Sequence, residues 1–457
     1  MLINHLLRCA LDLGFDKREV TLIQVENATA TLFESADDMF SHSKYISFIF
    51  RGSQKDKYIT FHSENCDVDT LKRQFEEAIN LKKRIVLPVY NNFSQAKVSY
   101  KKLMNISEEP SRMLLSDKAK EIYKEIYKKF NEMKNEQEDI LFIEQCCFGY
   151  LHYNNHTKNN LGFSYQRSED YYYIVLSLQM KCGNTIYNSI NSRYGKDLLK
   201  INIDDFIAES LTAITLKAEA QTIETGLYNI VLSNKVAAHL LDAFSPIFFA
   251  ENIQVGHSCL KDKIGKNIAS SIINLYDSGR CNYSSHIVEY DYEGTKVDEK
   301  VLIENGILKN YLYNSCAVAL DGKTAGGNSF MYDNLIGTNI TNFYIKPSDM
   351  KFDDLLKIDY GLLVTEISDL TGIINFSTGD ISTSISGFEI VNGEIRKAFD
   401  HAILNSNICN MLQKVIALDS DMYFTLPDNT GSVGTPNMLI EEINITQLPT
   451  SEGTKVI

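Results

Sequence analysis

Two Asn-Gly dipeptides constrain the second half of this chain more than any other feature of its sequence. Asn305-Gly306 separates the strand-like residues 300–304 and 307–312, and Asn392-Gly393 separates residues 388–391 from 394–395. Asn-Gly readily adopts the two positive-φ positions of a type I′ turn, which joins adjacent antiparallel strands. The sequence therefore predicts two β-hairpins here, and we interpret this half as mainly antiparallel β structure with a few helices.

The first half alternates strand-like and helical patterns. Residues 19–25 and 45–50 alternate like half-buried strands. Helices are predicted at residues 4–13, from Asp67 onward, at 116–139 and at 204–224. The 116–139 segment repeats apolar residues at three- and four-residue spacing after Ser116, a plausible N-cap. This pattern favours a helix packed on a sheet over one that binds a partner.

Gly226 lies between the last of these helices and the strand-like residues 228–232. We place a domain boundary there. Residues 1–225 are then an N-terminal α/β domain with a mixed sheet and long helices, and residues 226–457 a C-terminal, mainly antiparallel β domain. The predicted fold class is α+β.

Charge and composition exclude several classes of function. The 59 acidic and 45 basic residues give a net charge of −14, without the basic stripe that binds phosphates, so no nucleic-acid partner is predicted. No apolar run reaches the roughly 20 residues that span a bilayer, and the N-terminus lacks a secretory signal. The nine cysteines form no C-x-x-C pair, which is typical of a reducing compartment. We therefore expect a cytoplasmic protein without a membrane partner.

Known catalytic and metal-binding motifs are absent or incomplete. No H-E-x-x-H is present, and the nearest imidazole pair, His152 and His156, lies in a strand-like segment, which favours surface histidines over a metal site. Residues 256–260 lack the last glycine of a nucleophile elbow. Residues 322–324 end like a phosphate-binding P-loop, but Ala317 replaces its first glycine. We therefore predict no catalytic residue, metal ligand or cofactor in this chain.

Eight segments of the second half, taken in order, resemble the TldD/PmbA family, whose members are described as modulators of DNA gyrase and as metallopeptidase subunits. They are 258–265 (SCLKDKIG), 290–295 (YDYEGT), 302–308 (LIENGIL), 324–328 (TAGGN), 338–339 (TN), 372–380 (GIINFSTGD), 387–395 (GFEIVNGEI) and 433–436 (VGTP). The first half is similar to the family more loosely, through its order of elements and residues 159–162 (NNLG).

The resemblance implies two kinds of chain. TldD-like members carry an H-E-x-x-x-H zinc motif after the first strand of the C-terminal domain and a later cysteine ligand, whereas PmbA/TldE-like members lack both. Alignment by eye places Leu241, Asp242 and Pro246 at the histidine, glutamate and histidine, and Met422 near the cysteine. Leu241, Pro246 and Met422 cannot bind zinc. This chain is therefore identified as a PmbA/TldE-like member, with zinc expected only in a TldD-like partner.

The resemblance also implies a function. TldD-like and TldE-like subunits enclose a cavity in which an unfolded peptide, such as the leader segment of a ribosomal peptide precursor, is cut at the zinc of the TldD subunit. We expect this chain to complete that cleft. The alternative is a PmbA-like homodimer that binds peptides without hydrolysis. A further alternative is an enzyme that uses Asp242, His257 or Cys259, and direct modulation of gyrase is the least favoured.

One polar segment is a candidate for the wall of the cleft. It lies between two strand-like stretches and contains Asn375, Ser377, Thr378, Gly379 and Asp380. Small polar residues and glycine allow a peptide backbone to approach closely. An ordinary turn is the alternative.

Overall fold

The computed structural model describes residues 2–34, 38–54, 57–64, 70, 73–74, 76–77, 112–133, 141–182, 185–195, 201–284, 286–323, 326–332, 335–368, 370, 374–427 and 431–448. The chain divides into an N-terminal unit, Met1–Ala218 with Asp333–Leu335, and a C-terminal unit, Glu219–Tyr332 with Ile336–Ile457. The domain boundary expected at Gly226 stays a prediction. The helix expected from Asp67 lies largely outside the described residues.

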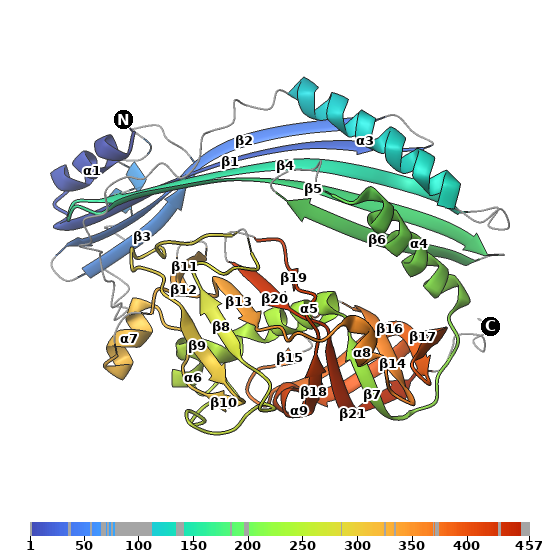
Figure 1. The fold of residues 1–457 in the computed structure, drawn as a ribbon. Coiled ribbons are helices and arrows are strands. Elements are labelled where there is room, and N and C mark those ends of the chain that lie inside the picture. The colour runs from blue at the N-terminus through green and yellow to red at the C-terminus, as the bar shows by residue number, and fades with distance from the viewer. Residues whose placement is uncertain are drawn as a thin grey trace, which may run out of the picture. The chain divides into compact units, whose positions relative to one another are not determined.

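The described residues of the N-terminal unit form a six-stranded sheet in the order β3-β2-β1-β4-β5-β6 (Figure 1). Its strands are β1 (Lys17–Leu32), β2 (Met39–Gln54), β3 (Lys57–Ser63), β4 (Leu141–Asn159), β5 (Ser164–Cys182) and β6 (Thr185–Gly195). Every described pairing is antiparallel. The expectation of a mixed sheet here was wrong. β1 to β3 and β4 to β6 each pair in chain order, and β4 joins β1 antiparallel after the connection that contains α3 (Arg112–Met133).

Helices of the N-terminal unit pack against this sheet. α1 (Leu2–Asp12) contributes Leu6 to a core that includes Phe50 of β2. α3 (Arg112–Met133) and α4 (Ile203–Glu219) share a second core with β4 and β5.

Two helix ends differ from the sequence-based expectation. α3 begins at Arg112, so Ser116 lies inside the helix and is not its N-cap. α4 ends at Glu219, five residues before the predicted end. The chain leaves the helix there because the backbone N–H of Gln221 donates to the carbonyl of Ala398 at 2.9 Å.

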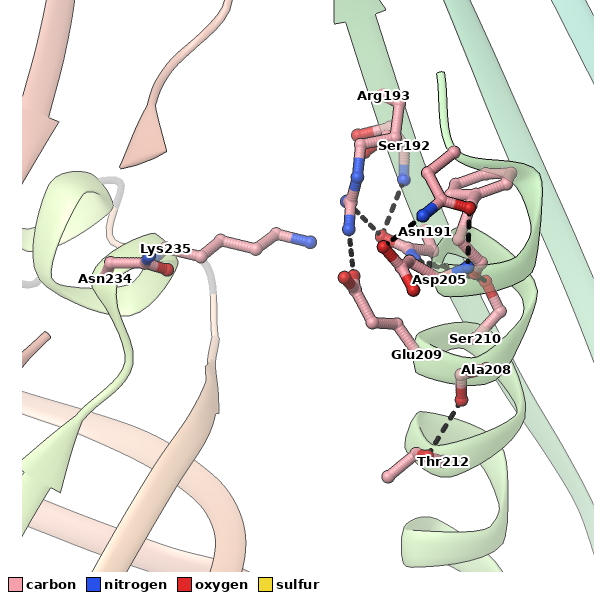
Figure 2. Close-up of polar contacts among 12 residues, drawn as sticks. Asn191, Ser192, Arg193, Asp205, Ala208, Glu209, Ser210, Thr212, Asn234 and Lys235 are labelled. Atoms are coloured by element: carbon pink, nitrogen blue, oxygen red, sulfur yellow. Dashed lines mark hydrogen bonds and ion pairs between the residues drawn. The ribbon is translucent and has the colours of Figure 1, made fainter. Parts of the chain in front are cut away.

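A buried amide fixes α4 against β6, at the edge of the described sheet. Figure 2 shows Asn191 of β6 facing the first turns of α4, where its Nδ2 donates to Ser210 Oγ at 3.1 Å and to the Phe206 carbonyl at 3.4 Å. Arg193, two residues further along β6, forms an ion pair with Glu209. These contacts set the position of the helix along the strand.

The described residues of the C-terminal unit form two large sheets (Figure 1). One has the order β10-β9-β8-β13-β20-β19, made of β8 (Leu275–Ser278), β9 (Lys300–Glu304), β10 (Ile307–Leu308), β13 (Asn342–Ile345), β19 (Tyr423–Phe424) and β20 (Ser432–Thr435). The other has the order β14-β7-β21-β17-β16-β15, with β18 beside β21. Its strands are β7 (Gly226–Leu232), β14 (Tyr360–Ile367), β15 (Ile374–Asn375), β16 (Asp380–Val391), β17 (Glu394–Asn407), β18 (Val415–Leu418) and β21 (Met438–Gln447). β11 (Ser329–Tyr332) and β12 (Leu335–Thr338) form a separate pair.

Both Asn-Gly turns form the predicted hairpins. φ is 49° at Asn305 and 79° at Gly306, between β9 and β10, and 51° at Asn392 and 80° at Gly393, between β16 and β17. Most described pairings in this unit are antiparallel, whereas β13–β20 and β14–β7 are parallel. The α+β class is confirmed.

One extended core joins the two sheets of the C-terminal unit to most of its helices, whereas Leu355 packs in a separate cluster. The helices are α5 (Asn234–Phe244), the 3-10 helix η2 (Ser245–Phe248), α6 (Ala250–Gln254), α7 (Ser315–Asp321), α8 (Phe352–Leu355) and α9 (Ile408–Gln413). Phe244 of α5, Phe248 of η2 and Phe343 of β13 are fully buried in this core. Among the described residues, no helix is both long enough and apolar enough to cross a bilayer.

Candidate functional site

The helix that follows the first strand of the C-terminal unit carries Leu241 and Asp242, two of the positions that the sequence alignment compares with the zinc motif. α5 follows β7 directly, and Ser233 is its N-cap, because the backbone N–H of Val236 donates to Ser233 Oγ at 3.3 Å. The apolar face of α5, which includes Leu240 and Leu241, is buried. The sequence thus places a well-capped amphipathic helix here.

Residues at the end of β20 and just after it fix the start of α5. The backbone N–H of Asn234 donates to Asn437 Oδ1 at 2.6 Å, and Thr435 Oγ1 donates to the Asn234 carbonyl at 2.7 Å. Gly434 precedes Thr435, and a Cβ at this glycine would lie 2.3 Å from the Phe424 ring. Within segment 433–436, Thr435 therefore positions α5, and Gly434 packs against Phe424 of β19 with no room for a side chain.

A buried carboxylate holds Asn437 in turn. Asp419 is fully buried and accepts hydrogen bonds from the backbone N–H of Asn437 at 2.9 Å and from its Nδ2 at 2.6 Å. Burial raises the pKa of Asp419 above its ordinary value, and the hydrogen bonds from Asn437 oppose that rise. The carboxylate thus orients the amide that receives the first N–H of α5.

The residues aligned with zinc ligands do not form a zinc site. Leu241 is buried in the core, Pro246 lies in the first turn of η2, and Met422 lies just before β19. Hydrocarbon, imide and thioether groups do not supply the imidazole, thiolate or carboxylate set that zinc requires. Asp242 lies exposed on α5. Within the described part of the chain, no group of three or more His, Cys, Asp or Glu side chains could hold a metal ion.

His239 is a residue of this helix that the sequence analysis missed. It lies on the exposed side of α5, and its ring centroid is 6.3 Å from that of Tyr423 in β19. Partial burial of the ring lowers the pKa of His239, and the charge of Lys235 lowers it further. The sequence signal that could have identified His239 was an imidazole in the helix after the first strand. A single imidazole beside a tyrosine is not a metal site.

The other histidines considered from the sequence have separate positions. His152 and His156 lie on β4, where His152 Nδ1 contacts Asp170 Oδ1 at 2.8 Å and His156 Nε2 contacts Ser164 Oγ at 3.3 Å. Burial lowers the pKa of His156. His257 is exposed. The structure does not bring these three histidines to a common partner.

The candidate cleft residues form the tip of a hairpin. Asn375 of β15 pairs with Asp380 of β16, and the backbone N–H of Gly379 donates to the Asn375 carbonyl at 2.6 Å. Asn375 Oδ1 also accepts from the backbone N–H groups of Ser377 at 3.0 Å and Thr378 at 3.3 Å. The side chain of Asn375 therefore stabilises the turn, while Ser377 and Thr378 are exposed.

At Gly379 the hairpin tip packs closely against the rest of the C-terminal unit. Its φ is 84°, and a Cβ would lie 3.2 Å from Cys259 Sγ, Asn407 Nδ2 and Ile408 Cγ2. Asn407 Nδ2 donates to Asp380 Oδ1 at 2.9 Å, and this hydrogen bond lowers the pKa of Asp380. Gly379 thus has a structural role that its sequence context did not reveal.

Comparison with known proteins identifies the C-terminal unit. A family model described as the PmbA/TldA metallopeptidase C-terminal domain matches residues 225–447. These residues are similar to the C-terminal domain of the TldD/PmbA family. The family is metallopeptidase-like, and the resemblance found in the sequence is confirmed.

Relatives with different names share this TldD/PmbA domain. An uncharacterized protein of Methanocaldococcus jannaschii is 32% identical over 57% of this chain and 61% of its own length. A metalloprotease TldD homolog of Buchnera aphidicola is 26% identical over 54% of this chain and 53% of its own length. A metalloprotease PmbA homolog of Haemophilus influenzae is 24% identical over 48% of this chain and 47% of its own length. The chain thus spans about half to three fifths of the length of the curated relatives that it matches.

Solved structures extend the similarity of fold to nearly the whole chain. TldE from Thermococcus kodakarensis matches 98% of this chain and 100% of its own with a TM-score of 0.82 at 18% identity. A Thermotoga maritima protein described as a modulator of a DNA gyrase matches 97% of this chain and 99% of its own with a TM-score of 0.83 at 19% identity. At this identity, the similarity shows a shared fold.

One TldD/PmbA segment, 290–295, forms a buried polar network with neighbouring parts of the chain. In segment 290–295, Asp291 Oδ1 accepts from the backbone N–H groups of Glu293 at 2.9 Å and Thr295 at 2.8 Å. Asp291 Oδ2 accepts from the backbone N–H of Ser329 at 3.0 Å, and Glu293 Oε2 accepts from that of Ser315 at 2.9 Å. Burial, and secondly the charge of Glu293, raise the pKa of Asp291 to about 7. These carboxylates hold loops together and have a structural role.

A second buried carboxylate links further TldD/PmbA segments. Asp277 of β8 accepts hydrogen bonds from Asn328 Nδ2 at 2.7 Å and from the backbone N–H of Thr341 at 2.6 Å. Lys300 Nζ lies 3.6 Å from the same carboxylate. Segment TAGGN thus contacts Asp277 through Asn328, whose Nδ2 also donates to the Asn339 carbonyl of segment TN at 2.8 Å. Thr324 and Ala325 lie outside the described residues. The family motifs retained in this chain maintain its framework.

We predict that Asp419→Ala lowers the free energy of unfolding of the C-terminal unit by about 3 kcal/mol, because the Asn437 amide loses its charged acceptor in a buried place. Asp421→Ala is the matched control, since Asp421 is exposed and accepts from Asn234 Nδ2 at 3.2 Å. The control substitution should lower the free energy of unfolding by less than about 1 kcal/mol. Urea unfolding followed by circular dichroism measures both, and equal losses would contradict the role given to Asp419.

Proposed function

We propose that this chain is the non-catalytic, PmbA/TldE-like subunit of a TldD/TldE-type zinc peptidase. In this proposal it forms a heterodimer with a TldD-like catalytic subunit and completes an enclosed cleft for unfolded peptides. The zinc, and the cleavage, belong to the partner. Unfolded peptides are the substrate class, for example leader segments of ribosomal peptide precursors, so the complex serves peptide maturation. A cytoplasmic location belongs to the proposal, and the free described cysteines are consistent with it.

One observation carries this proposal. α5 is positioned by Thr435, Asn437 and Asp419, yet its ligand-equivalent positions hold Leu241 and Pro246. In this proposal, the chain keeps the framework around a TldD-type metal site without the donors that bind the metal. A subunit that shapes a cleft needs the framework and does not need the donors.

Recognition of the peptide by its backbone suits this role. An extended peptide can add to the edge of a sheet through main-chain hydrogen bonds, which tolerate many sequences. β15 and the hairpin tip at residues 375–380 lie at one end of the described strand order in the second sheet, and Ser377 and Thr378 there are exposed. We propose that Asn375, Ser377, Thr378, Gly379 and Asp380 line the cleft.

The proposal is tested by reconstitution with a TldD-like chain from the same genome. An unstructured peptide is incubated with this chain alone, with the partner alone and with the mixture, each with and without a chelator. We expect cleavage only by the mixture, and loss of that cleavage when the chelator removes zinc from the partner. A variant partner without its zinc ligands controls for contaminating peptidases.

Two results would contradict the proposal in different ways. Cleavage by this chain alone that resists the chelator would indicate its own catalytic residues, with Asp242, His257 and Cys259 as candidates. Peptide binding by a stable homodimer that forms no complex with a TldD-like chain would support the alternative of a PmbA-like homodimer without hydrolysis. Size-exclusion chromatography with light scattering distinguishes the two kinds of dimer.

Within this proposal, Ser377→Trp should lower peptide turnover by the complex roughly tenfold or more, because an indole at the cleft wall displaces the peptide backbone. Ser377 is exposed, and the side chain of Asn375 still stabilises the turn when Ser377 is replaced. The free energy of unfolding should therefore change by less than about 0.5 kcal/mol. Ser271→Trp, at another exposed turn serine, is the matched control. Normal turnover by Ser377→Trp would place the hairpin outside the cleft.

A further inference from the structure

Two cysteines far apart in the sequence meet beneath the hairpin tip at residues 375–380. Cys259 Sγ and Cys409 Sγ are 3.9 Å apart, although 150 residues separate them in the chain. A disulfide has sulfurs about 2.05 Å apart, so the thiols need to approach by about 2 Å. Rotation about the two Cα–Cβ bonds moves each sulfur by this order of distance. The pair is therefore in van der Waals contact and close to bonding geometry.

The backbone on both sides of the pair is fixed. The backbone N–H of Cys259 donates to the Phe376 carbonyl at 2.8 Å, and that of Cys409 donates to Asn407 Oδ1 at 3.1 Å. The next N–H, that of Ile408, donates to the Gly379 carbonyl at 2.8 Å. Both cysteines thus contact the hairpin tip directly or through their neighbours, and these hydrogen bonds hold their backbones beside it.

The surroundings favour a reactive thiolate at Cys409. Both side chains pack against the edge of the core but remain partly exposed, so a small oxidant can reach them. The thiol of Cys259 hydrogen-bonds to Cys409 and holds the pKa of Cys409 below its usual range, and the positive charge of Lys263 adds to this effect. Thiolate character together with access determines which cysteines react with oxidants.

We propose that Cys259 and Cys409 are a reversible disulfide site that responds to hydrogen peroxide. The Cys409 thiolate attacks one peroxide oxygen, the O–O bond breaks, and hydroxide leaves, which gives a sulfenic acid at Cys409. The Cys259 sulfur then attacks the sulfenic sulfur, the S–O bond breaks, and water leaves with the Cys259 proton. In total, two thiols are oxidised to one disulfide and one peroxide is reduced to two waters.

The disulfide would tie the segment around Cys259 to the start of α9, and both hold the hairpin tip. Oxidation would therefore restrict the motion of residues 375–380. A thiol such as dithiothreitol reverses the change by exchange. A reversible link of this kind suits a reducing compartment, where disulfides are transient and regulatory. This site is independent of any partner and of any peptidase activity.

The test uses the full-length protein, purified in reduced form and treated with hydrogen peroxide. Peptide mapping without reduction should find a peptide of Cys259 joined to a peptide of Cys409, formed roughly tenfold faster than oxidation of the exposed Cys182. Oxidation should raise the melting temperature by several degrees, since the link closes a long loop. Hydrogen exchange should slow in the peptide spanning residues 374–382. Dithiothreitol should reverse all three changes.

Cys259→Ser and Cys409→Ser should abolish the link and the shift in melting temperature, whereas Cys182→Ser should keep both. The wild-type peptide map requires no variant, so it gives an answer even if a serine variant folds poorly. Oxidation of Cys182 before the pair would overturn the proposal. So would links from Cys259 or Cys409 to other cysteines, or a link that changes neither melting temperature nor hydrogen exchange.

Discussion

The buried carboxylate of Asp419 is the constraint on which the geometry around α5 depends. It orients Asn437, whose side-chain oxygen accepts a hydrogen bond from the backbone N–H of Asn234, the first residue of α5. The Thr435 hydroxyl donates to the carbonyl of Asn234. A helix end that lacked these partners would leave backbone donors unsatisfied beside a packed core. The position of α5 therefore depends on residues almost 200 positions later in the chain.

Buried carboxylates also hold the rest of the C-terminal unit together, away from the positions that the sequence alignment compares with zinc ligands. Asp277, Asp291 and Glu293 bind backbone and side-chain groups of neighbouring segments, so their replacement would loosen loops across the C-terminal unit. Leu241 and Pro246 instead contribute apolar groups to the helix and to the turn that follows it. The residues that hold the framework are therefore different from the positions aligned with zinc ligands.

Local patterns in the sequence predicted local structure well. Asn305-Gly306 and Asn392-Gly393 fix their turns through backbone preferences alone, and both hairpins are present. Strand partners were not predictable in the same way, because an alternating pattern indicates a strand and not its neighbours. The N-terminal sheet was therefore expected to be mixed and is antiparallel in all its described pairings. The contact between Cys259 and Cys409, and the packing that requires glycine at Gly379, depend on tertiary contacts that no local pattern contains.

The central claim is that the framework around α5 holds no metal in this chain and works beside a partner that does. Its most direct test is the zinc content of the isolated chain and of its copurified complex with a TldD-like subunit, measured after purification without chelators. The account predicts substantially less than one zinc per isolated chain and about one per heterodimer, since tight zinc sites need three or four imidazole, thiolate or carboxylate ligands. About one tightly held zinc in each isolated chain would contradict it.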